Sequence, residues 1–137
     1  MNVIRGPRRD LVAVALGGMA GASVRYGLSE LRAIGDGSFP WATFAENVGG
    51  CLLLGVAMVV IARRCAAGSL VRPLVAVGFL GSFTTFSAFI IEGELMVRSG
   101  DSTLAAAYWT ASLAAGLVAA LVGIAVASRL VPQRQMA

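Results

Sequence analysis

The stretch Gly81–Phe89 reads G-S-F-T-T-F-S-A-F and lies inside the third of four long apolar segments. It brings a glycine, four hydroxyl residues and three phenylalanines to a place where a membrane helix ordinarily carries leucine and valine. In lipid, such polar and helix-weakening residues persist only where they face protein or a water-filled path. A broken membrane helix also frees backbone carbonyls and amide dipoles to coordinate ions. The stretch therefore predicts a third helix broken near Gly81–Thr85, with a small-ion site at the break.

The composition indicates a membrane protein. The 137 residues are 58% hydrophobic and 13% charged, and the mean hydropathy is +0.82. These values are typical of membrane proteins. Four apolar segments are each near or above the roughly 20 residues that span a bilayer. We expect an all-α membrane protein with one four-span domain over residues 1–137, and a bundle this thin favours oligomers. The expected spans are Leu11–Leu28, Trp41–Ala62, Leu70–Val97 and Leu104–Val131.

All eleven basic residues are arginines, and most of them lie at the ends of these segments. With four spans, the N-terminus, the second loop and the tail share one side, which collects eight arginines against Arg32 and Arg98 on the other. The positive-inside rule then puts both termini in the cytoplasm. Because topology explains the charge, a nucleic-acid partner is not expected. The first segment carries Arg25 and is too long for a signal core, so we do not expect a cleaved signal peptide.

Several kinds of chemistry have no residues to support them. The chain has no histidine, and its two cysteines, Cys51 and Cys65, fall within or at the end of the second segment. On one helix they would lie roughly 20 Å apart at 1.5 Å per residue, too far for a disulfide. A zinc or haem site and histidine-based catalysis are not expected, and we predict that the chain is not an enzyme.

The polar residues inside the spans are the informative ones. Arg25 is either a snorkelling or structural arginine or an anion-attracting charge. Thr43 and Asn47 are four residues apart on one helix face, where hydroxyl and amide donors can bind an anion or join helices. Glu46 points about 100° away, and an intramembrane carboxylate usually pairs, protonates or lines a water path.

Phenylalanines recur in the third segment at Phe83, Phe86 and Phe89, which predicts one stripe along a helix. Such a stripe is either packing or a set of electropositive ring edges that hold a small anion. On the fourth segment, Tyr108 and Ser112 form a polar face at a spacing of four. Elsewhere, Gly17 and Gly21 form a G-x-x-x-G pattern, which is typical of close helix packing.

Three motifs together resemble the Fluc (CrcB) family of fluoride channels. They are G-G-M-A-G-A-S-V-R-Y at Gly17–Tyr26, T-F-A-E-N-V-G-G at Thr43–Gly50 and G-F-L-G-S-F-T-T-F-S-A-F at Gly78–Phe89. The length and the four-span layout are also similar, so the resemblance covers nearly the whole chain. The third motif is the most specific of the three.

The resemblance implies an antiparallel dimer with two narrow fluoride pathways in a bacterial plasma (inner) membrane. Ring edges of Phe86 and Phe89 would face fluoride, and Asn47 would supply the essential amide. Backbone carbonyls of Gly81 and Thr84 would hold one structural sodium ion (Na+) on the dimer axis. The implied pathway residues are Asn47, Phe86, Phe89, Thr43, Thr85, Ser87, Tyr108 and Ser112, with Glu92 near the track and Arg25 in the vestibule.

The sequence departs from the family pattern at two positions. Gly116 stands where relatives can extend the polar track with a hydroxyl, and Glu46 stands where a small apolar residue is usual. A carboxylate beside an anion path would repel fluoride, so we expect Glu46 to be turned away, paired or protonated. The arginine bias suggests one fixed orientation and hence a heterodimer with an oppositely inserted paralogue, but we rank the antiparallel homodimer first because the ion-site residues are present.

The leading interpretation is a fluoride-selective channel that lets cytoplasmic fluoride leave passively and so reduces its toxicity. Fluoride ion and membrane lipid are the expected partners of this integral, multi-pass protein. One alternative is a small proton-coupled drug or cation exporter that uses Glu46 or Glu92 as its proton site. Another is a non-transporting membrane assembly protein whose glycines only pack helices.

Overall fold

The computed structural model describes residues 7–30 and 39–132. Four helical stretches in this part of the chain are long and apolar enough to cross a membrane, and they agree with the predicted spans to within about one turn at each end. The prediction of an all-α, four-span membrane protein is confirmed. Three of the arginines counted for the orientation, Arg5, Arg32 and Arg134, lie outside the described residues. The elements are α1 (Pro7–Glu30), α2 (Trp41–Arg64), η1 (Arg72–Leu80), α3 (Gly81–Phe83), α4 (Phe86–Arg98) and α5 (Ser102–Leu130).

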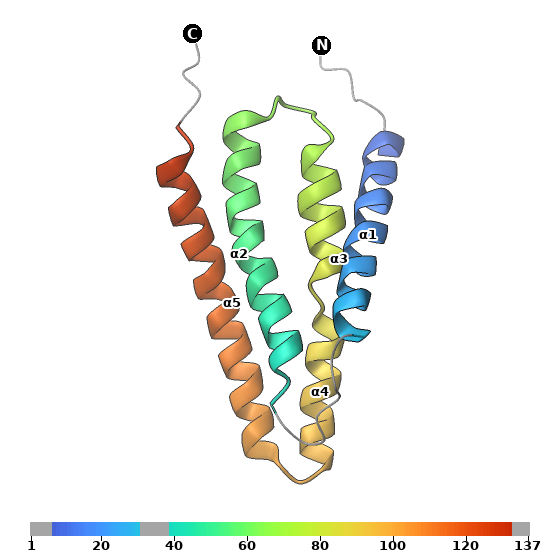
Figure 1. Cartoon of the computed structure of the whole chain (residues 1–137), viewed down its shortest axis with the longest axis vertical. Coiled ribbons are helices and arrows are strands. Elements are labelled where there is room, and N and C mark those ends of the chain that lie inside the picture. The colour runs from blue at the N-terminus through green and yellow to red at the C-terminus, as the bar shows by residue number, and fades with distance from the viewer. Residues whose placement is uncertain (1–6, 31–38, 133–137) are drawn as a thin grey trace.

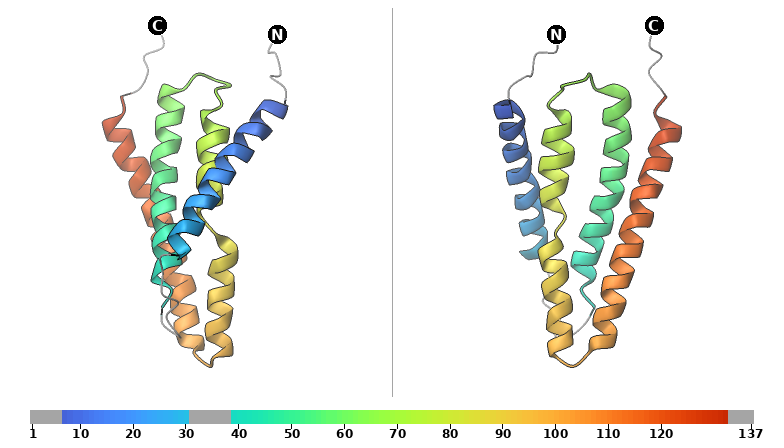
Figure 2. Two further views of the ribbon diagram at one scale, coloured as in Figure 1. Left: turned by 45° about the vertical axis from the view of Figure 1, so that its right-hand side comes forward. Right: turned by 180° about the vertical axis from the view of Figure 1, so that it is seen from behind.

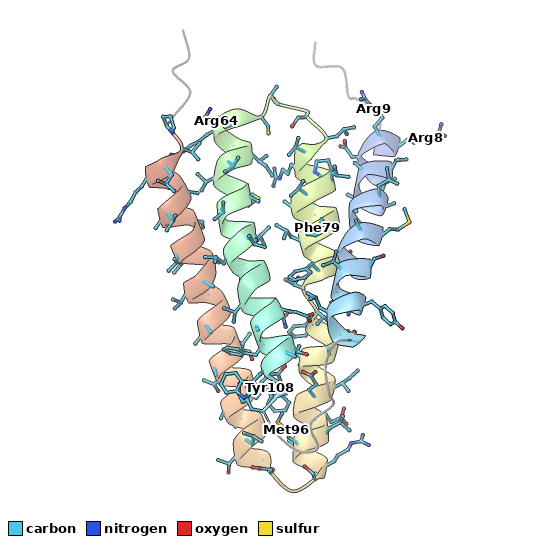
Figure 3. All side chains as sticks on the ribbon, viewed as in Figure 1. Arg8, Arg9, Arg64, Phe79, Met96 and Tyr108 are labelled. Carbon is cyan, nitrogen blue, oxygen red and sulfur yellow. The ribbon has the colours of Figure 1, made fainter. Side chains whose placement is uncertain are left out.

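The spans stand side by side in a thin bundle, in the order α5, α2, third span and α1 (Figure 1). α2 packs along α5, α1 packs on η1, and α4 packs on the first half of α5. The start of α1, the end of α5 and the α2–η1 connection lie at one end of the bundle. Arg8, Arg9 and Arg64 mark that end in Figure 3, opposite Met96 and Tyr108. α2 and α5 consequently run in the same direction.

Glycines let the helices approach to backbone contact. A Cβ added at Gly21 of α1 would overlap the carbonyl oxygen of Phe79 on η1, and one at Gly17 would overlap that of Leu74. α1 crosses η1 obliquely at this contact (Figure 2). Gly55 of α2 lies in the same way against Ala120 on α5. The predicted packing role of the G-x-x-x-G pattern is confirmed.

The third span is the irregular one. Its first nine residues form η1, a π-helix, a conformation that is rare and mostly limited to single turns. After the short α3, Thr84 and Thr85 have extended backbone, with ψ of 152° and 126°. α4 then begins at Phe86, and the Thr85 hydroxyl caps it by accepting from the amide of Ala88 at 3.2 Å. Two residues in mid-span therefore lack helical geometry.

A small buried core joins α4 to α5. It comprises Phe89, Met96, Ala105 and Tyr108, with partly buried aromatic and leucine side chains around it. Much of the remaining apolar surface is exposed, including Leu117 at 64%. A single chain therefore leaves large apolar faces for lipid or for another subunit.

Candidate functional site

The side chain of Asn47 is joined to the extended part of the third span by two hydrogen bonds. Its Nδ2 donates to the carbonyl oxygen of Thr85 at 2.9 Å, and its Oδ1 accepts from the Thr85 amide at 2.8 Å. This pair uses both backbone groups of one residue that has left the helix, and it fixes the orientation of the amide. An Nδ2 group carries two N–H donors, so one remains for another acceptor.

A second polar junction lies one turn earlier on α2. The Thr43 hydroxyl donates to Glu92 Oε1 at 2.6 Å, and the Tyr108 hydroxyl donates to Glu92 Oε2 at 2.8 Å. Thr43 and Tyr108 are buried, at 5% and 0% exposure. Each hydroxyl has a single O–H, so both donors are committed to the carboxylate. Glu92 thus ties α2, α4 and α5 together. The sequence predicted Glu92 only as a residue near the track or as the proton site of an exporter.

The seam between the parallel helices α2 and α5 keeps one register along its length. Arg63 of α2 donates to the Ser128 carbonyl of α5, 65 positions later in the chain. The pairs Gly55–Ala120 and Cys51–Gly116 are in contact at the same offset. Thr43 and Tyr108, which both donate to Glu92, keep the same offset along the chain. This register places Ser112 level with Asn47.

Ser112 carries the one buried side-chain polar atom that has no hydrogen-bond partner among residues 7–30 and 39–132. A buried hydroxyl without a partner costs about 1–3 kcal/mol, so such an atom marks a place where a ligand or water completes the bonding. The seam therefore presents a Ser112 hydroxyl and an oriented Asn47 amide at one level, with the Glu92 junction one turn below.

The phenylalanines do not form the single predicted stripe. Phe83 stacks with Phe79, with ring centroids 6.2 Å apart and planes 2° apart. Phe86 and Phe89 form a separate pair at 5.5 Å, and Phe89 lies 5.5 Å from Tyr108. The prediction of one stripe is wrong because extended backbone at positions 84–85 breaks the helical periodicity between Phe83 and Phe86.

Two carbonyls at this interruption lose the amides that would bond to them in a continuous helix. The Thr85 amide, four residues after Gly81, donates to Asn47, and the Ala88 amide, four after Thr84, donates to the Thr85 hydroxyl. The carbonyl oxygens of Gly81 and Thr84 are thus left as acceptors. Within the described residues, no group of three or more His, Cys, Asp or Glu side chains could hold a metal, so a cation at this interruption would depend on such carbonyls.

Each of the remaining candidate residues has a polar partner in the structure. Arg25 Nε donates to the Ser82 carbonyl at 3.1 Å, which gives the arginine a structural partner in α3; a vestibule role stays a prediction. The exposed hydroxyl of Ser87 lies 3.2 Å from that of Thr85. Glu46 is 7% exposed and has a polar or electrostatic partner, in line with the expectation that this carboxylate is not a bare charge in the path.

Comparison with known proteins identifies the family. The family model described as CrcB-like protein, Camphor Resistance (CrcB), matches residues 12–124. The chain is 43% identical over 116 residues to the fluoride-specific ion channel FluC 3 of Streptomyces avermitilis, covering 85% of this chain and 57% of the relative. It is 42% identical over 115 residues to the fluoride-specific ion channel FluC of Rhizobium etli strain CIAT 652, covering 82% and 91%.

A third relative, the fluoride-specific ion channel FluC 2 of Nocardia farcinica, is 41% identical over 114 residues, which are 83% of this chain and 79% of the relative. The chain spans little more than half the length of the Streptomyces protein but nearly all of the Rhizobium protein. The matched regions include all three motifs quoted from the sequence. The chain therefore belongs to the CrcB-like protein family.

Proposed function

We propose that this protein is a fluoride-selective channel that lets fluoride leave the cytoplasm passively. The observation that carries the proposal is that the oriented Asn47 amide and the unpartnered Ser112 hydroxyl lie at one level of the α2–α5 seam. Both groups offer donors, which suit a small anion. Relatives about 40% identical over most of this chain are named fluoride-specific ion channels. Neither an exporter of drug-like cations nor an assembly protein gains support from these relatives, and a channel is not an enzyme.

The proposed path passes the Phe86–Phe89 pair, the amide of Asn47 and the hydroxyl of Ser112. Phe89 is 5% exposed and packs against Tyr108, so its ring is held in place. Thr43 and Tyr108 donate to Glu92, so an anion at their level must compete with a carboxylate for those protons. Thr85 contributes mainly through its backbone, which orients Asn47, and its hydroxyl links to Ser87.

We infer that the third span works as a broken helix covered by a second copy. Phe86 is 71% exposed on the single chain, next to exposed Ser87 and the extended backbone at positions 84–85. Irregular backbone does not face lipid in the hydrocarbon region. An antiparallel dimer would cover this strip and would bring two copies of each pathway together. A location in the bacterial inner membrane follows from the proposed export of cytoplasmic fluoride.

The same dimer would suit one structural sodium ion. Gly81 and Thr84 each present a carbonyl without its helical amide donor, and unwound backbone carbonyls coordinate Na+ in other membrane proteins. Gly81 is exposed, and a Cβ there would find only the Ala76 carbonyl, 3.9 Å away. A second copy related by a two-fold axis would add its own pair of carbonyls.

Growth of a bacterium that lacks its own fluoride exporter tests the proposed function. Expression of this chain should restore growth in fluoride medium, and Ser112→Ala should reduce the rescue because it removes the hydroxyl at the level of Asn47. Rescue against a cationic drug but not against fluoride would instead favour the exporter, and no rescue by a chain that reaches the membrane would refute the channel.

A compartment-sensitive reporter on the C-terminus separates the two possible dimers. Signal on both sides of the membrane supports the homodimer that we propose. Signal only in the cytoplasm, together with loss of function when the chain is expressed alone, would make it one half of a heterodimer with an oppositely inserted paralogue. The count of eight arginines against two favours the second outcome on charge alone.

A further inference from the structure

The polar seam does not end at Ser112. Thr43, Asn47 and Cys51 follow one another at a spacing of four on α2, and Tyr108, Ser112 and Gly116 do so on α5. Residues at this spacing share a helix face. The constant register pairs the two series level by level, so the third level consists of Cys51 and Gly116.

Gly116 makes room for the Cys51 thiol. Gly116 is buried, and a Cβ added there would lie 3.4 Å from Cys51 Sγ. That is ordinary contact distance, so the sulfur lies against α5 at Gly116. Sulfur is a soft, polarizable atom and its S–H is a weak donor. The α5 face has no side chain at this level, and the α2 face supplies the polar group.

The seam closes immediately beyond this level. A Cβ at Gly55 would overlap the Ala120 carbonyl oxygen, and one at Gly123 would overlap the Leu52 carbonyl oxygen. With backbones this close, no space remains between α2 and α5 for an ion. Cys51 is therefore the last polar side chain along the seam before the two helices meet.

We propose that the fluoride path includes Cys51, whose thiol is the lining group next along the path after Asn47 and Ser112. The inference rests on the proposed channel function. A thiol at that position makes the path sensitive to a small neutral thiol reagent, because any group added to Sγ must occupy the space beside Gly116. Fluoride on the path should in turn slow the modification.

The test uses the full chain carrying Cys65→Ser, reconstituted in proteoliposomes and treated with methyl methanethiosulfonate. The Cys51 sulfur attacks the reagent and forms an S–SCH3 disulfide, the reagent's own S–S bond breaks, methanesulfinate leaves, and the thiol proton passes to the buffer. Fluoride efflux should fall at least ten-fold, recover when a reductant removes the group, and be protected by high fluoride but not by chloride.

Two variants control the experiment. The fluoride efflux that remains in Cys51→Ala with Cys65→Ser should not change when the reagent is added. Adding Leu53→Cys to that variant puts the thiol on an exposed position of the same helix, 51% exposed in the native chain, where modification should leave the efflux of that variant unchanged. Protection by fluoride separates a lining role from a packing role, since a thiol that only packs would be modified at the same rate with either anion.

The outcomes distinguish this inference from the channel function itself. No fluoride efflux from the untreated Cys65→Ser chain would count against the proposed function. Normal efflux that persists after mass spectrometry shows Cys51 to be modified would overturn the inference alone. Efflux from a chain whose Cys51 resists the reagent, when the same thiol reacts after unfolding, would also overturn it.

Discussion

Replacement of Asn47 by aspartate should abolish most fluoride flux, for a reason that the structure makes specific. Asn47 uses one N–H and one oxygen to hold both backbone groups of Thr85, at 2.9 and 2.8 Å. An aspartate can still accept from the Thr85 amide. Its second oxygen, however, stands where the N–H donor was and faces the Thr85 carbonyl oxygen.

The size of the effect follows from that exchange. Losing one hydrogen bond and leaving a buried acceptor without its partner costs about 1–3 kcal/mol. At about 1.4 kcal/mol per factor of ten, the equilibrium constant for joining residue 47 to the Thr85 backbone falls by roughly 5- to 150-fold. The new negative charge also repels an anion at the level of Ser112. We expect fluoride efflux to drop at least about ten-fold.

The assay is the initial rate of fluoride efflux from proteoliposomes, normalised to folded protein. Asn47→Leu serves as the companion variant, because it removes the donors without adding charge. It should also lose flux, but without added charge repulsion. Undiminished efflux from a properly assembled Asn47→Asp protein would remove Asn47 from the pathway and refute the reasoning.

Three further predictions concern other parts of the fold. Phe86→Ile and Phe89→Ile should each cut fluoride flux strongly, and only Phe89→Ile should lower protomer stability, since Phe86 is 71% exposed. If both variants conduct as well as the native chain, the two rings only pack and do not line the path. Gly81→Val should weaken the proposed dimer more than Thr84→Ser, and thermal stability should be higher in sodium than in a large organic cation at equal ionic strength. Equal stability in both salts would argue against the proposed sodium site. Gly55→Val should destabilise the protein by about 1–3 kcal/mol through overlap with Ala120. Gly49→Ala should be neutral, because a Cβ there meets no atom within 4 Å. Equal melting temperatures of the two variants would contradict the packing account.

The spans could be predicted from the sequence because hydropathy over some 20 residues depends on local composition alone. The packing role of Gly17 and Gly21 was also predictable, since a spacing of four sets one helix face. The partners of the polar side chains could not be predicted. Thr43 and Glu92 are 49 positions apart, and Asn47 and Thr85 are 38 apart, so their contacts depend on how the spans pack.

The aromatic residues show the limit of periodicity most clearly. A spacing of three predicts that Phe83 and Phe86 share a face only if the helix is continuous between them. Extended backbone at Thr84 and Thr85 removes that condition. Phe83 then pairs with Phe79 and Phe86 with Phe89. The Arg25 bond to the Ser82 carbonyl depends on the same interruption and was visible in the sequence only as one of two alternatives.

Passive anion efflux from proteoliposomes that contain only this chain tests the central claim most directly. Vesicles are loaded with fluoride, with chloride or with a drug-like cation, without a pH gradient, and release begins when an ionophore supplies the balancing charge. The account predicts rapid fluoride release, chloride release close to that of empty vesicles and no cation release. Cation movement that needs a pH gradient, or fluoride release no faster than from empty vesicles, would contradict it.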